Sequence, residues 1–273
     1  MPARFCDLHV HTYFSDGTFS PKEVVEYAVK KGLSAIAITD HDCIDGIAPA
    51  IAAADKTDLE IIPGIEFTTE LDTKEIHMLG FFIDYKQKWF TEELRSLCSM
   101  RDKRMRKMLE CLMKFNISVA IDDIKEIAGK GSFGRLHLAK VLVKKGYVKS
   151  PQEAFDKFLG NGKACYVEGD RISPIDAINM ISRLGGVAVL AHPFTVGKDE
   201  LIPVLVKAGL KGIEAYHTDH NDLTAARYKK IAQEYGLLPT GGSDCHGMNK
   251  GKVLMGTVVV PYEVVEKLKS LSK

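Results

Sequence analysis

The sequence has no long hydrophobic run and no excess of charge of one sign, and each absence excludes a class of protein. No apolar stretch in the 273 residues approaches the roughly 20 residues that a membrane-spanning helix requires, so we expect no membrane partner. Lysine and arginine total 37 against 36 aspartate and glutamate, which leaves a formal net charge of +1. Without a strongly basic surface, duplex DNA is not an expected partner, although a local basic patch permits a phosphorylated substrate.

The six cysteines are scattered, and no two of them form a C-x-x-C pair. A zinc ribbon and a dithiol redox motif are therefore excluded. The even number permits disulfides, but Met1-Pro2-Ala3-Arg4 leads directly into a predicted strand, so we expect no signal peptide. We predict reduced cysteines and a cytoplasmic protein.

Short apolar runs alternate with amphipathic stretches over most of the chain, which is typical of an α/β protein. Residues 33–39 form a continuous apolar run of the kind found in parallel sheets that are covered on both faces. Ser20-Pro21 predicts a helix start, and Gly32 predicts the end of that helix. Seven or so parallel strands favour a barrel over an open sheet, although the alternation alone does not separate a closed barrel from a doubly wound sheet. The predicted strands cover residues 4–10, 33–39, 60–65, 76–83, 186–191, 212–217, 237–242 and 256–260.

The alternation stops after Asp84, where a long segment has only helical patterns. We predict a helical insertion at residues 91–166 that caps the substrate site from the rim of the barrel. The barrel domain would then consist of residues 1–90 and 167–273. The predicted helices of the insertion cover residues 91–116, 121–128, 135–145 and 151–159.

Nine residues that bind metals well lie at the ends of the apolar runs. Burying imidazoles and carboxylates without partners is costly, so a packed interior does not need them there. His9-Val10-His11 is the sharpest local signal, because side chains two apart on a strand project from the same face. Catalytic groups of parallel α/β proteins gather at the carboxyl ends of strands, so we expect the nine to converge. They are His9, His11, Asp16, His41, Glu66, His77, His192, Asp244 and His246.

Taken together, these motifs resemble the PHP (polymerase and histidinol phosphatase) family over essentially the whole chain. The resemblance is closest to small stand-alone bacterial phosphoesterases with a helical insertion. It implies a distorted (β/α)7 barrel with a trinuclear metal site. The motifs that carry it are Asp7-Leu8-His9-Val10-His11, Ile38-Thr39-Asp40-His41-Asp42, Pro63-Gly64-Ile65-Glu66, Ala191-His192-Pro193 and Gly242-Ser243-Asp244-Cys245-His246.

The resemblance also implies which residues hold three divalent ions. Imidazoles and carboxylates without a thiolate suit Mn²⁺, Fe²⁺ or Zn²⁺. We interpret Cys245, which lies between two ligands, as a packed thiol. The implied groups are His9, His11, Glu66 and Asp244 for the first ion, Glu66 with His77 and His192 for the second, and Asp16, His41 and His246 for the third.

Clustered metals suggest the mechanism. Two divalent ions about 3.5–4 Å apart share a water, lower its pKa and direct the hydroxide at phosphorus. A third ion and basic side chains would neutralise the remaining phosphate oxygens. We expect no side-chain nucleophile, and we assign Glu66, His192 and Asp244 to support of the metal-activated hydroxide.

A glycine-rich loop predicts the first substrate-binding residues. Residues 129–134 satisfy G-x-G-x-x-G, but they follow a predicted helix rather than a strand, so a dinucleotide fingerprint is excluded. Free N–H groups at the next helix start favour an anion. Arg135 adds a bidentate phosphate donor, and His137 is a candidate beside it.

Other basic residues are candidates for a second contact with substrate. The run at residues 101–107 is interpreted mainly as a solvated helix face. Within it, Arg101 and Arg104 flank the buried stripe and are candidates for binding a second phosphate. His217 and His220 end another strand and are predicted to line the pocket.

The leading hypothesis is a phosphoesterase that acts on nucleoside 3′,5′-bisphosphates or on the 5′ ends of short RNA. An insertion carrying several arginines suits a substrate with two phosphates. The first alternative is a histidinol-phosphate or other small-metabolite phosphatase. A metal-free PHP-like binding or regulatory protein is a distant alternative, because all nine ligand positions hold competent residues. A barrel hydrolase for C–N bonds is disfavoured, because Glu66 stands where such enzymes usually have a metal-bridging lysine.

Overall fold

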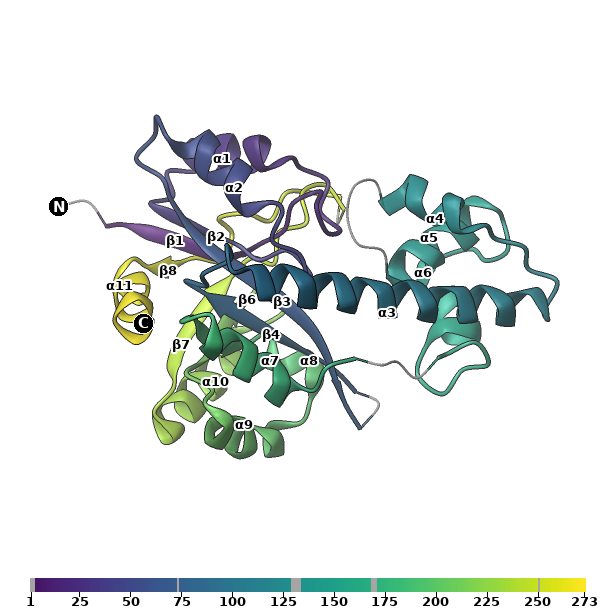
Figure 1. Ribbon diagram of the computed structural model, residues 1–273. Helices are drawn as coiled ribbons and strands as arrows, with labels where there is room; N and C mark the ends of the chain where they lie inside the picture. The colour runs from purple at the N-terminus through teal and green to yellow at the C-terminus, as the bar shows by residue number, and fades with distance from the viewer. Residues whose placement is uncertain (1–2, 73, 129–133, 168–170, 250) are drawn as a thin grey trace.

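The computed structural model describes residues 3–72, 74–128, 134–167, 171–249 and 251–273. Its centre is one sheet of eight strands with helices on both sides (Figure 1). The strand order is β7-β6-β5-β4-β3-β2-β1-β8. The strands are β1 (Phe5–Val10), β2 (Ala35–Ile38), β3 (Glu60–Leu71), β4 (Lys74–Phe81), β5 (Val187–Leu190), β6 (Gly212–His217), β7 (Leu238–Gly242) and β8 (Val260–Pro261).

The chain that follows β7 pairs with the end of β1, so the sheet forms a nearly closed barrel. The His11 N–H donates to the Cys245 carbonyl at 3.0 Å, and the Cys245 N–H donates to the His9 carbonyl at 3.2 Å. Val10 and Cys245 form a parallel bridge at the same place. The predicted α/β barrel is confirmed, and Cys245 is buried as a packed thiol.

The expectation of parallel strands throughout is wrong for β4 and β8. β4 is antiparallel to both of its neighbours, and β8 is antiparallel to β1. The reason at β4 is a hairpin: β3 extends to Leu71, β4 begins at Lys74, and Asp72 between them has a φ of 48°. Charged residues interrupt the apolar pattern at residues 66–75, which hides the fact that this segment completes both strands.

Helices pack against the strands, and α1 (Pro21–Lys30), α7 (Pro174–Arg183) and α10 (Asp222–Tyr235) begin at polar side-chain caps. α1 starts as predicted: Ser20 accepts a hydrogen bond from the Glu23 N–H, and Glu23 accepts one from the Ser20 N–H. Over the described ranges, no helix combines the length and apolar content needed to cross a membrane. The remaining helices around the barrel are α2 (Ile47–Ala54), α8 (Pro193–Val196), a 3-10 turn (Asp199–Leu201), α9 (Ile202–Ala208) and α11 (Glu263–Leu271).

The predicted helical segment lies beside the barrel and has its own core (Figure 1). The long helix α3 (Lys88–Met113) joins the two parts. Near its start Phe90 packs into the barrel core, whereas Met105 and Met108 pack into the second core. The boundaries of this segment at residues 91–166 stay a prediction. Its other helices are α4 (Ile121–Ala128), α5 (Arg135–Lys144), α6 (Pro151–Ala154) and a π-helix (Phe155–Leu159).

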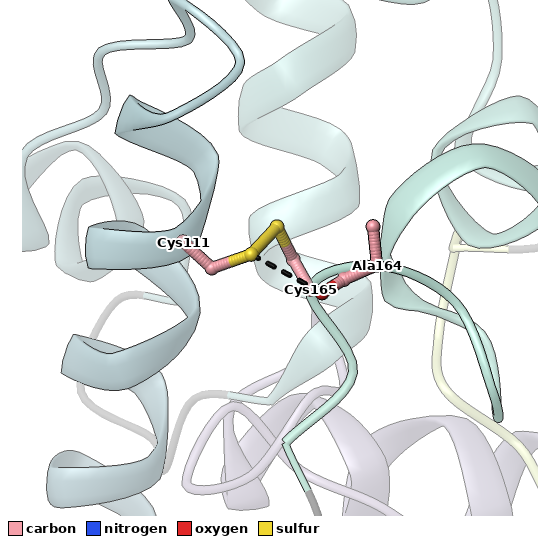
Figure 2. The surroundings of a disulfide bond; sticks show 3 residues. All are labelled: Cys111, Ala164 and Cys165. Carbon is pink, nitrogen blue, oxygen red and sulfur yellow. Dashed lines mark hydrogen bonds between the residues drawn. A yellow bond between two sulfur atoms is a disulfide. The ribbon is translucent and has the colours of Figure 1, made fainter.

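A disulfide joins Cys111 of α3 to Cys165, in the loop after the π-helix (Figure 2). The prediction of reduced cysteines is therefore wrong for this pair. Cysteines 54 residues apart form no short motif, and only the packing of the second core brings their Cα atoms within 5.4 Å. The free thiols are Cys6, Cys43, Cys98 and Cys245.

We expect reduction of this disulfide to lower the free energy of unfolding by roughly 2–4 kcal/mol, because the bond closes a long loop in the unfolded chain. Urea unfolding with and without a reductant measures the difference. The Cys165→Ser variant is the control, because its stability should not respond to the reductant. Equal stability of the wild-type protein under both conditions would show that the bond does not restrict the unfolded chain.

Candidate metal centre

Glu66 lies at the centre of the histidine cluster, and its two carboxylate oxygens face different imidazoles. Oε2 lies 3.1 Å from both His9 Nε2 and His11 Nε2. Oε1 lies 2.9 Å from His77 Nδ1 and 3.1 Å from His192 Nε2. One carboxylate therefore touches two groups of imidazoles, as a bridging ligand must.

Two aspartates extend the cluster. Asp244 Oδ1 lies 3.2 Å from His11 Nε2. Asp16 Oδ1 lies 3.1 Å from His246 Nε2, and its Oδ2 lies 4.0 Å from His41 Nε2. The predicted residues thus converge from the ends of different strands, as the strand-end argument requires. Among the described residues, four groups have ligand atoms within 4.8 Å of one another: His11, Asp16, His41 and His246; His9, His11, Glu66 and Asp244; His41, Glu66 and His77; and His9, Glu214 and His217.

The backbone is strained at two of these positions. His192 has a φ of 24° and Asp244 has a φ of 50°, which non-glycine residues rarely adopt. At His192 the conformation is held by its N–H, which donates to Glu214 Oε2 at 2.8 Å. Such strain persists where the surrounding structure enforces it, and it is frequent at functional sites.

The carboxylates of the cluster are ionised. Burial raises the pKa of Glu66, but the charges of the surrounding imidazoles outweigh burial and hold it well below its usual range. The pKa values of Asp16 and Asp244 lie well below their usual range for the same reasons. Ionised carboxylates are the form that binds divalent cations.

Buried polar atoms without hydrogen bonds show that the residues fit metal ions. His11 Nε2 and Asp16 Oδ1 are buried, and within the described part of the chain neither atom makes a hydrogen bond. The carboxylate oxygens near His11 are within 3.2 Å, but not in hydrogen-bond geometry. Leaving such atoms unpaired is costly, and bound divalent cations would satisfy each of them. The mixed nitrogen and oxygen donors suit Mn²⁺, Fe²⁺ or Zn²⁺.

Three of the histidines are oriented by contacts on the side that faces away from Glu66. His9 Nδ1 lies 3.0 Å from Glu214 Oε1, and His77 Nε2 lies 3.0 Å from Glu75 Oε1. His192 Nδ1 lies 2.9 Å from the Thr195 hydroxyl. Such partners fix the ring orientation of metal-binding histidines. We did not predict Glu214, whose signal in the sequence is a carboxylate inside strand β6, between the apolar residues Ile213 and Ala215.

We expect Glu214→Gln to lower turnover by roughly 10–100-fold, the range for residues that orient metal ligands. Glu214 contacts both the His9 ring and the His192 backbone, so its loss affects ligands of two predicted ions. Metal content of the purified variant should fall as well. Glu234→Gln, on the exposed face of α10, is the matched control. Normal turnover and normal metal content in Glu214→Gln would show that Glu214 does not orient the metal ligands.

A cavity of about 210 Å³ lies beside the cluster and is strongly cationic. Among the predicted substrate residues, Arg135 lines it and its Nη2 donates to Glu75 Oε2 at 2.7 Å. His137 also lines it, and its Nδ1 accepts from the Gly134 N–H at 3.1 Å. Residues 129–133 of the glycine-rich loop lie outside the described residues. Arg171, which we did not predict, completes the cavity and donates to Glu75 Oε2 at 2.5 Å.

The two candidate arginines of α3, Arg101 and Arg104, also line this cavity. Arg101 forms an ion pair with Asp42. Arg104 Nε donates to the Val167 carbonyl at 2.8 Å, while its buried Nη2 makes no hydrogen bond to any described residue. Burial and the neighbouring guanidinium groups lower the pKa of Arg104 to about 10. The guanidinium groups of Arg101 and Arg104 therefore favour the binding of an anion in this cavity.

The two histidines at the end of β6 and just after it differ from each other. His217 lines a second cavity, next to Asp244. His220 lines neither of these cavities: its Nδ1 donates to the Ala215 carbonyl at 2.9 Å, and its ring stacks on Tyr228 with centroids 5.4 Å apart. The pocket position predicted for His220 therefore does not match its contacts, which are those of a packed residue.

A nearly closed barrel with buried imidazoles and carboxylates at its strand ends defines a metal-dependent hydrolase. Residues 7–145 match the family model of the PHP domain. The chain is 34% identical to a 5′-3′ exoribonuclease of Haemophilus influenzae, over 88% of this chain and 89% of the relative. It is 32% identical to a 3′,5′-nucleoside bisphosphate phosphatase of Chromobacterium violaceum, over 90% of this chain and 88% of the relative.

A solved structure agrees over the full length. A protein of Bifidobacterium adolescentis, provisionally described as a metal-dependent phosphoesterase, superimposes with a TM-score of 0.87 and 30% identity. The match covers 100% of this chain and 98% of that protein. The chain therefore belongs to the PHP domain family, and its reaction class is the hydrolysis of phosphoric esters.

Proposed function

We propose that this chain hydrolyses phosphate esters of nucleotides, either nucleoside 3′,5′-bisphosphates or the 5′ ends of short RNA. The observation that carries the proposal is the cationic cavity directly beside the histidine cluster. Its four arginines are Arg101, Arg104, Arg135 and Arg171. A cluster that activates water and a cavity that binds anions are the two parts a phosphoesterase needs.

Three divalent ions would be held by the groups that the family resemblance implies. When bound, divalent ions polarise phosphate oxygens and lower the pKa of water. Glu66 supports the bridging assignment because each of its oxygens faces a different set of imidazoles. The groups are His9, His11, Glu66 and Asp244; Glu66, His77 and His192; and Asp16, His41 and His246.

The arginines support a substrate with two phosphates. Arginine presents a planar fork of donors that matches phosphate oxygens. Arg135 and Arg171 share the single carboxylate oxygen Glu75 Oε2, which leaves guanidinium charge in excess in the cavity. Histidinol phosphate offers one phosphate and carries an amine, so it would use less of this charge. The names of the two relatives agree with a nucleotide substrate.

Phosphate release tests the proposal. The protein is loaded with Mn²⁺ and given adenosine 3′,5′-bisphosphate or histidinol phosphate at equal concentration, with a chelator-treated sample as control. We expect preference for the bisphosphate and loss of activity after chelation. Preference for histidinol phosphate would support the small-metabolite alternative. Absence of both turnover and bound metal would support the metal-free binding protein.

A further inference from the structure

A second cavity, of about 430 Å³, opens from the same cluster. We name it the Lys140 groove, because Lys140 lines it and does not line the arginine-rich cavity. His192 and Asp244 form its inner end, and Lys140 and Asn249 line it from different parts of the fold. Its volume lies within the usual range for ligand sites. The cluster is therefore accessible from two cavities of different chemistry.

Outside the histidine cluster, the charged residues that line the Lys140 groove are Lys140 and Asp219; the carboxylates at its inner end belong to the cluster. Among the described residues that line it, Lys140 is the one lysine or arginine. Asp219 also lines it, but its side chain is 57% exposed, so water and salt screen its repulsion of an anion. Leu136 adds an apolar surface and lines both cavities. One cation beside an apolar surface matches one nucleotide unit, which has a singly charged phosphodiester and a base.

Lys140 is held in place across the groove. Its Nζ donates to Asn249 Oδ1 at 3.1 Å, which links α5 to the loop after β7. Asn249 is itself anchored by a hydrogen bond from its Nδ2 to the Asp16 carbonyl. An ammonium group has three donors, so Lys140 can keep this contact and still bind a phosphate oxygen.

His217 supplies a donor near the inner end of the groove. Its Nδ1 accepts from the Asp219 N–H at 3.1 Å, so the ring carries a hydrogen on Nε2. That Nε2 is buried, lies 3.6 Å from Asp244 Oδ2, and makes no hydrogen bond within the described part of the chain. A buried donor without a partner at the side of a cavity indicates a ligand atom, such as a phosphate or ribose oxygen.

We propose that the Lys140 groove holds the nucleotides on the 3′ side of the scissile bond in a short, single-stranded, 5′-phosphorylated oligoribonucleotide, with Lys140 contacting the next phosphodiester. This inference rests on the proposed function. Both proposed substrate classes contain a nucleoside with a 5′-phosphate and a phosphate on its 3′ oxygen. Water adds to that 3′ phosphorus, the bond from phosphorus to the 3′ oxygen breaks, and the 3′ oxygen leaves with a proton. Only the oligonucleotide has a further residue on phosphorus, and the groove receives it.

The test uses the full-length, Mn²⁺-loaded protein and two substrates, a 5′-phosphorylated triadenylate and adenosine 3′,5′-bisphosphate. Lys140→Gln should lower kcat/KM for the triadenylate about tenfold or more and leave the bisphosphate within twofold. The salt dependence of the triadenylate KM should also weaken, by roughly 0.7 in the log–log slope for one lost phosphate contact. Lys144→Gln is the matched control: it lies one turn further along α5, is exposed and pairs with Glu126.

The possible outcomes distinguish failure of the groove proposal from failure of the proposed function. Equal losses on both substrates, or no loss on the triadenylate, would overturn the role of Lys140. Wild-type protein that releases phosphate from the bisphosphate but leaves the triadenylate intact overturns the groove proposal and keeps the phosphatase. Wild-type protein that acts on neither substrate overturns the proposed function, and the groove proposal with it.

Discussion

Glu66→Gln is expected to reduce turnover by on the order of 10³-fold or more, because residues that only orient metal ligands already contribute 10–100-fold. Glu66 contacts imidazoles through both oxygens and is buried at the centre of the cluster. The amide keeps the shape of the side chain but removes the negative charge and one acceptor. A neutral group bridges two cations poorly, so at least one predicted ion should be lost.

The measurement combines phosphate release with metal content. We expect Glu66→Gln to fold, as judged by circular dichroism, and to contain less metal than the wild-type protein. Glu60→Gln is the matched control, because Glu60 begins the same strand and contacts Tyr262 and Lys269 instead of the cluster. Wild-type turnover in Glu66→Gln would exclude the bridging role.

The metal cluster could be predicted because its signal is local. A histidine or carboxylate at the end of an apolar run is costly unless it has partners, so each position is informative by itself. The fold then brings strand ends together without further information. The structure places His9, His11 and Glu66 in contact as this argument requires, although they lie up to 57 residues apart in the chain.

The features that we missed depend on contacts between distant segments. The hairpin of β3 and β4 is hidden because Glu66, Glu70 and Glu75 interrupt the apolar pattern. The Cys111–Cys165 pair depends on the second core, and Arg171 reaches the cavity from a segment 96 residues after Glu75. No short motif reports such pairs, so helical and strand periodicity cannot reveal them.

Arg135→Ala is expected to lower kcat/KM for phosphate-bearing substrates by roughly 1.5–3 kcal/mol, the range for hydrogen bonds to charged groups, which is about 10- to 150-fold. Arg135 is 14% exposed and lines the arginine cavity. Its Nη1 contacts Asn161 Oδ1 at 3.2 Å, and its Nη2 contacts Glu75, so the guanidinium is positioned before substrate binds. Such preorganisation is what the alanine variant removes.

The division of this loss between KM and kcat identifies what Arg135 does. Glu75 contacts His77 through Oε1 and Arg135 through Oε2, so Arg135 acts on substrate directly and on a predicted ligand through Glu75. A rise in KM without a change in kcat indicates that Arg135 only binds phosphate. A lower kcat indicates that Arg135 also acts on His77 through Glu75. Arg135→Lys should recover part of the affinity, because lysine keeps the charge without the planar fork. Arg183→Ala, where the guanidinium stacks on Trp89, is the control. An unchanged kcat/KM in Arg135→Ala would show that Arg135 does not bind substrate. Anion binding in the cavity would then depend on its other arginines.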